Sequence, residues 1–216
     1  MIRSRRSLTC AALVLIACLV PAAGCVNTLA GLAYIIKGTN VPAEYKDLKE
    51  KKVVVVCRTP ASLTFGNANI ARELTHEVSR LLEQRISKVE MVSASDVENW
   101  CDENSWDDPR EIGKGLEAQM VVDIDLEHFS LYKGQTLYQG SADYTVQVID
   151  IENGGDVVFK KTPPQLLWPP NSAVLTSEKR EPEFRQQYLA VLAGEIGALF
   201  YPHDAYDAYA RDADAL

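Results

Sequence analysis

The sequence predicts one compact mixed α/β domain with helices packed on a single mixed sheet, in the order βαβαβββα. Three stretches carry this prediction. Residues 52–57 (KVVVVC) are a short β-branched run, which is typical of a strand buried on both faces. Residues 68–86 repeat apolar side chains every three or four positions, which indicates an amphipathic helix. Residues 137–151 and 156–161 flank a turn-forming tip and indicate an antiparallel hairpin.

Between the long helix at 68–86 and the hairpin that begins at 137, the sequence first contains a further strand and two helix starts. Residues 89–92 predict the strand. The spacing of Ser95 and Glu98 fits a capping box that opens a short helix. Asp108 and Pro109 fit the cap and the first position of another helical segment. A last helix is predicted to begin near residue 182, because its apolar positions repeat at helical spacing.

The predicted strand at 120–131 alternates apolar and acidic side chains. We expect its apolar side chains to face the core and Asp123, Asp125 and Glu127 to project from the other face. Carboxylates about 6–7 Å apart on one strand face could bind a hard cation with help from another element. With His128, these residues form the candidate site of a metal-dependent hydrolase. The alternative is a solvated outer face without chemistry.

The stretch 162–179 contains four prolines and is predicted to be irregular. Leu167 and Trp168 lie among these prolines. They would either pack against the domain or stand out as a contact patch for a protein partner, since aromatic side chains often anchor protein interfaces.

The amino-terminal residues have the composition of an export signal. Three arginines precede an apolar stretch, 8–20, which is too short to span a bilayer. The stretch ends in Leu-Val-Pro-Ala-Ala-Gly-Cys at 19–25, which resembles the lipobox of bacterial lipoproteins. Ala22 stands where that family most often has leucine. The alternative is an ordinary cleaved signal in which the cysteine is incidental.

The lipobox resemblance implies that Cys25 is acylated, becomes the mature amino terminus and anchors the protein in a lipid bilayer facing the periplasm. Two or more acyl chains bury enough methylene groups for stable attachment. Val26 follows the cysteine where inner-membrane lipoproteins of enteric bacteria carry aspartate, and the family rule therefore favours the outer membrane.

The charge of the chain is acidic. Removing residues 1–24 takes away three arginines and no acidic residue, which changes the formal net charge from −8 to −11. We therefore expect no nucleic-acid partner and no polybasic contact with anionic lipid. An apolar fraction of 47% allows one ordinary hydrophobic core.

Two cysteines remain in the mature domain. Because the periplasm is oxidising, a disulfide between Cys57 and Cys101 is one prediction. Two separate buried thiols are the alternative, since spacing in sequence does not show whether two Cα atoms approach each other.

The order of elements over about residues 41–200 resembles a periplasmic α/β module. That module occurs in the amino-terminal part of the Tol translocation protein, in curli secretion lipoproteins and in lipoprotein activators of penicillin-binding proteins. Those relatives bind proteins and some oligomerise. The resemblance therefore implies a non-catalytic accessory role in the cell envelope, with an envelope protein or a second copy as the partner.

The predicted organisation is a signal peptide at 1–24, a lipidated tether at 25–40, the domain at 41–202 and an acidic tail at 203–216. No serine elbow or phosphate-binding glycine loop is present, and we expect no cofactor. His76 lacks the second histidine, four positions later, of the zinc-binding helix pattern. The sequence favours a protein-binding module over an enzyme.

Overall fold

A computed structural model describes residues 40–64 and 69–204 of the chain. The description below concerns the unit that begins at residue 41, together with Asn40. The signal peptide, the lipidation site Cys25 and most of the acidic tail lie outside the described residues, so these remain predictions from sequence.

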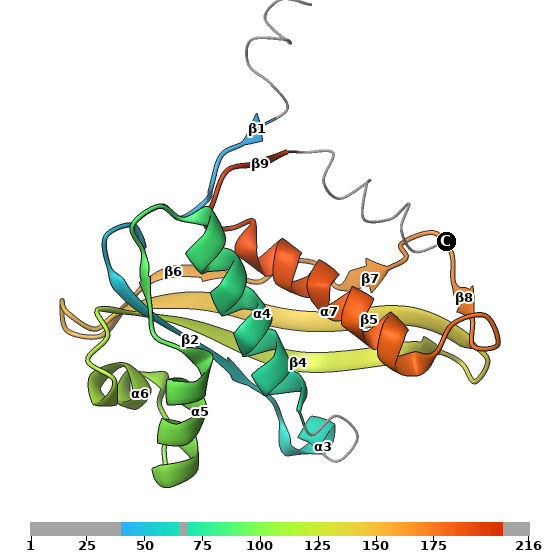
Figure 1. Ribbon diagram of the computed structural model, residues 1–216, viewed down its shortest axis with the longest axis horizontal. Helices are drawn as coiled ribbons and strands as arrows, with labels where there is room; N and C mark the ends of the chain where they lie inside the picture. Colours follow the sequence, from blue (N-terminus) through green and yellow to red (C-terminus); the bar gives the residue numbers. More distant parts are fainter. Residues whose placement is uncertain (1–39, 65–68, 205–216) are drawn as a thin grey trace, which may run out of the picture. The chain divides into compact units, whose positions relative to one another are not determined.

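A seven-stranded mixed sheet forms the centre of the domain (Figure 1). Its main path runs in the order β3 (Glu90–Met91), β2 (Lys52–Arg58), β4 (Met120–Lys133), β5 (Leu137–Asp150) and β6 (Asp156–Lys161). β2 pairs in parallel with both β3 and β4, whereas β4, β5 and β6 are antiparallel. The predicted α/β class with a mixed sheet is confirmed.

The main helices lie on both faces of this sheet. On the first face are α4 (Ile70–Arg85) and α7 (Glu181–Gly197), which lie in front of the sheet in Figure 1. On the second face are α5 (Ala94–Glu103) and α6 (Pro109–Gly115). With these four helices, the main path follows the predicted βαβαβββα order, α5 and α6 together filling one helical position.

Short elements that the sequence did not predict complete the domain. They are α3 (Ala61–Thr64), β7 (Leu166–Trp168), β8 (Val174–Leu175) and a separate two-stranded sheet of β1 (Asn40–Val41) and β9 (His203–Asp204).

The valine run in β2 is buried because both faces of the strand are covered. Val53 and Val55 belong to the core under α4 and α7, while Val54 and Val56 belong to a smaller core under α5 and α6. Alternate side chains of a strand point to opposite faces. A continuous apolar run is therefore what a strand between two helical layers requires.

The helix starts were predicted with mixed accuracy. Asp108 caps α6 as expected, since its side chain accepts a hydrogen bond from the backbone N–H of Arg110. The cap of α5 is Ser93, whose Oγ accepts from the backbone N–H of Asp96 at 3.1 Å. The Ser95 prediction was therefore wrong by two residues, because Ser93 has the extended backbone that a cap needs whereas Ser95 is already helical.

The proline-rich stretch is more regular than predicted. β7 and β8 both pair antiparallel with β5. Short strands at a sheet edge tolerate flanking prolines, since few of their backbone N–H groups enter the ladder. Trp168 in β7 is 3% exposed and stacks on Tyr188 of α7, so its predicted role as a surface contact is wrong. Leu167 points to the other face and is 40% exposed.

Candidate functional site: a charged groove between α4 and α7

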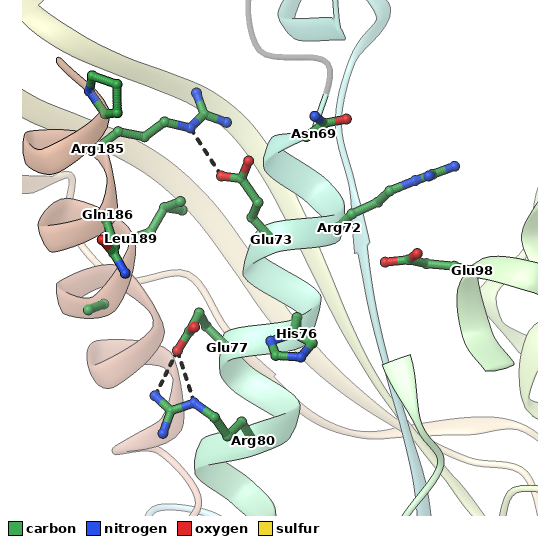
Figure 2. Close-up of a pocket in the computed structure, with 12 residues that line it drawn as sticks. Asn69, Arg72, Glu73, His76, Glu77, Arg80, Glu98, Arg185, Gln186 and Leu189 are labelled. Carbon is green, nitrogen blue, oxygen red and sulfur yellow. Dashed lines mark hydrogen bonds and ion pairs between the residues drawn. The ribbon is translucent and has the colours of Figure 1, made fainter. Parts of the chain in front are cut away.

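A hollow lies on the outer surface of α4 and α7 and extends to the neighbouring α5 (Figure 2). It has a volume of about 810 Å³. Residues of α4 and α7 form most of its lining, and Glu98 of α5 completes one edge. Every lining residue lies within a helix except Asn69, which is the N-cap residue of α4. The full set is Asn69, Arg72, Glu73, His76, Glu77, Arg80, Glu98, Pro182, Arg185, Gln186, Leu189 and Ala190.

Helical periodicity places the α4 residues on this surface. The lining positions 69, 72, 73, 76, 77 and 80 repeat at steps of three and four along the outward side of α4. Leu74, Val78 and Leu82 occupy the opposite side and are fully buried. The same spacing brings α7 positions 182, 185, 186, 189 and 190 to the groove. The amphipathic pattern that buries α4 therefore also builds the groove.

Ion pairs hold several of these side chains in place. Arg185 Nε donates to Glu73 Oε2 at 3.0 Å and joins α7 to α4. Arg80 donates to Glu77 at 2.7 Å along α4. Figure 2 shows both pairs. Because such pairs are partly exposed, each contributes roughly 0–1 kcal/mol, and their main effect is to orient the side chains.

Arg72 and Glu98 define the other side of the groove. Arg72 turns away from α7 and donates to Asp102 of α5 at 2.9 Å. Glu98 is half-buried on α5, and neither it nor His76 has a hydrogen-bond or ion-pair partner among the described residues. The Glu98 carboxylate is therefore open to a new ion pair. Glu98 is therefore a natural contact for a cation brought by a ligand.

Asp123 is not on a wet face, contrary to the expectation for its strand. Its carboxylate is fully buried, and its Oδ1 and Oδ2 each accept from Arg58 at 2.8 Å. Gln147 Nε2 also donates to Oδ2 at 3.0 Å. These hydrogen bonds to Asp123 raise the pKa of Arg58. The Arg58 guanidinium occupies the side of the Asp123 carboxylate at which a metal ion would bind. At Asp123, the predicted cation-binding residue is therefore a member of an ion pair.

Of the remaining members of the predicted metal set, Asp125 also pairs with Arg58, whose Nη2 donates to its Oδ2 at 3.4 Å. Asp125 and Glu127 border a smaller hollow of about 370 Å³ beside Arg58. His128 Nε2 contacts Ser141 Oγ at 3.2 Å on the exposed part of the sheet. Within residues 40–64 and 69–204, no three histidine, cysteine, aspartate or glutamate side chains are grouped closely enough to hold a metal ion.

Cys57 and Cys101 are both free thiols, so the predicted disulfide is not formed. Cys57 belongs to the core on the first face of the sheet, whereas Cys101 packs against the core on the second face. The sheet therefore lies between the two sulfurs. Burial raises the pKa of both thiols above the ordinary value, which leaves them in the unreactive protonated form.

Sequence reasoning identified the polar side of α4 but not the groove. The amphipathic pattern of residues 68–86 predicted a polar side of this helix, and Glu73, Glu77 and Arg80 lie on it. Nothing local to α4 indicates that Arg185, over a hundred residues later, lies against Glu73.

In the part of the chain that the structure describes, no helix is long and apolar enough to cross a membrane.

No known family model matches the chain, and no curated protein matches it. Solved structures do match. The PelC dodecamer of Paraburkholderia phytofirmans is 13% identical with a TM-score of 0.44, covering 75% of this chain and 95% of that chain. Lipoprotein GNA1162 of Neisseria meningitidis is 11% identical with a TM-score of 0.41, covering 67% and 96%. The LpoB carboxy-terminal domain of Salmonella enterica is 14% identical with a TM-score of 0.36, covering 62% and 90%.

These neighbours include a protein described as a lipoprotein and one described as a dodecamer. Their TM-scores are below 0.5 and their identities are low. The similarity therefore carries no argument about the role of this chain, and the α/β class rests on the strand pairing described above.

Proposed function

We propose that this chain is a lipid-anchored protein of the bacterial cell envelope that acts without catalysis and binds another protein through the α4–α7 groove. The observation that carries the proposal is the groove itself. It is an open hollow of about 810 Å³ that presents three arginines, a histidine and three glutamates from rigid helices.

The composition of the groove suits a protein ligand. Arginine is enriched at protein interfaces, where its planar guanidinium makes several hydrogen bonds at once. Arg72 is 52% exposed and uses only one of its terminal nitrogens for Asp102. The helical backbone that carries these side chains needs no further ordering on binding, which favours affinity.

The proposed location rests on the sequence. The lipobox-like residues 19–25 support an acylated Cys25, and Val26 supports the outer membrane as the site of attachment. The acidic net charge makes the acyl chains, rather than basic residues, the means of membrane attachment.

The test is co-purification from gently solubilised membranes, followed by mass spectrometry. We expect a defined partner with the wild-type chain, and loss of that partner with Arg72→Glu. Lys160→Glu is the matched control, because Lys160 is exposed on β6 and outside the groove. Both variants make the same change in charge at exposed sites, so both should fold.

Cys25→Ala tests the anchor separately, and we expect it to release the protein from the membrane fraction. A partner that remains bound to Arg72→Glu would refute the groove as the binding surface. A protein that stays in the membrane as Cys25→Ala would refute lipidation as the means of attachment.

A further inference from the structure

We infer that the partner occupies the groove with an amphipathic α-helix of about three turns that brings a lysine or arginine to Glu98. This inference rests on the proposed function and specifies the chemistry of its ligand. Three features of the groove carry it: the absence of a strand edge in its lining, its length along α4, and the half-buried carboxylate of Glu98.

The lining of the groove favours a helical ligand over an extended one. α4, α7 and α5 have their interior backbone groups paired within each helix. An extended segment needs partners for its own N–H and C=O groups, as a strand edge would supply. A helix satisfies these groups internally and presents only side chains to the groove. The walls therefore match a third helix lying over two others.

The length of the groove sets the length of that helix. Its lining along α4 extends from Asn69 to Arg80. At 1.5 Å per residue, this distance is about 16 Å, or three turns. A ligand helix packed along α4 and α7 would place contact residues at spacings of three and four.

The chemistry of the contact residues follows from the two sides of the groove. Leu189 is 4% exposed and forms an apolar floor beside the exposed Ala190, so small apolar side chains of the ligand fit here. On the α5 side, Glu98 has no cation among the described residues although it is half-buried. Arg72 is directed to Asp102. A lysine or arginine of the ligand would complete the ion pair that Glu98 lacks.

Site-specific photo-crosslinking in intact cells tests the helix. The photoreactive amino acid p-benzoylphenylalanine replaces His76 or Gln186 in the groove, and Leu175 on the second face of the sheet as the control position. We expect crosslinks from both groove positions, mapped to partner residues three or four apart, and none from position 175.

The outcomes separate the two proposals. Crosslinks to alternate residues of an extended partner segment would overturn the helix and leave the groove as the binding surface. The absence of crosslinks from both groove positions would overturn the groove as well. Crosslinks to a second copy of this chain would overturn a distinct partner.

Substitution of Glu98 tests the ion pair. We expect Glu98→Gln to weaken partner binding about three- to tenfold, as loss of one interfacial charge pair does. Glu90→Gln is the matched control, because Glu90 is exposed on β3 outside the groove. Replacing the contacting basic residue of the partner by glutamate and Glu98 by lysine should restore binding. Unchanged affinity in Glu98→Gln would overturn the ion pair.

Discussion

The two faces of the central sheet differ in how far the helices cover them. On the first face, α4 and α7 cover a large core rich in aromatic residues, including Tyr138, Trp168 and Phe184. On the second face, α5 and α6 cover a smaller cluster around Val54, Val121 and Ile149. Beyond Val121 on this face, the next inward position of β4 is Asp123, which is paired with Arg58.

The two faces therefore contribute differently to the stability of the domain and to the chemistry of its surface. The large apolar core of the first face supplies most of the hydrophobic stabilisation, because that stabilisation grows with the apolar area removed from water. The second face changes from apolar to polar where its helical cover ends, and an antiparallel sheet can expose such a face to solvent. Most of the groove lining belongs to α4 and α7, the helices that pack on the larger core.

The comparison is tested most strongly by truncating one core residue on each face. Phe184 is fully buried and stacks on Tyr138 at 4.9 Å, so Phe184→Ala should lower the free energy of unfolding by about 3–5 kcal/mol. Ile112→Ala in the smaller core should cost about 2–3 kcal/mol. Urea unfolding measures both. Equal losses would show that the two cores contribute equally per residue.

Substituting either partner of the Arg58–Asp123 ion pair on the second face should lower the free energy of unfolding, but by different amounts. Arg58→Met leaves Asp123 buried without its cation and should cost about 3 kcal/mol. Asp123→Asn should cost about 1–2 kcal/mol, because the Arg58 side chain is 31% exposed and can turn to water.

A double variant provides the control for this pair. Arg58→Met with Asp123→Leu should recover most of the loss, because two apolar groups of similar volume replace both charges. Losses that simply add, measured by urea unfolding, would contradict coupling between the two side chains.

Substitution of one glycine beside each core compares the packing of the two faces through smaller changes in stability. A Cβ on Gly140 would lie 2.4 Å from the ring of Tyr188, which is fully buried in the first core. Gly140→Ala should therefore cost about 1–3 kcal/mol. A Cβ on Gly115 would lie 2.2 Å from Trp100 Nε1. Trp100 is only partly buried and can shift, so Gly115→Ala should cost less than about 1 kcal/mol.

Thermal unfolding of both alanine variants, with near-ultraviolet circular dichroism of the aromatic residues, makes this measurement. A larger loss for Gly115→Ala than for Gly140→Ala would mean that the second face is the more rigidly packed of the two.

The smallest effect expected concerns the turn between β5 and β6. Hydrogen bonds from Asn153 lower the pKa of Asp150 below its ordinary value. A lowered folded-state pKa contributes stability above the unfolded value, near pH 4, and this contribution is lost as the pH falls through the folded pKa. Asn153→Ala should therefore reduce the loss of stability on acidification below about pH 4.

The exposed Asn171→Ala is the matched control for the turn and should leave the pH profile unchanged. Unfolding by urea at several pH values between 2 and 6 gives both profiles. An unaltered acid slope in Asn153→Ala would show that Asp150 is not the group responsible.

The sequence by itself determined the elements whose signals are local. The valine run of β2, the stripe of α4, the β5–β6 hairpin and the start of α7 were all predicted, because side-chain periodicity and turn residues act over a few neighbours. Together with the strands predicted at 89–92 and 120–131 and the helical segments between them, these elements predicted the βαβαβββα order and the α/β class.

The tertiary structure alone decided which side chains meet. Trp168 is buried because β7 joins the edge of β5, and Asp123 is buried because Arg58 lies on the neighbouring strand. The groove exists because α7 packs beside α4, which brings Arg185 to Glu73. Each of these contacts joins residues that are distant along the chain, and local periodicity carries no information about such distances.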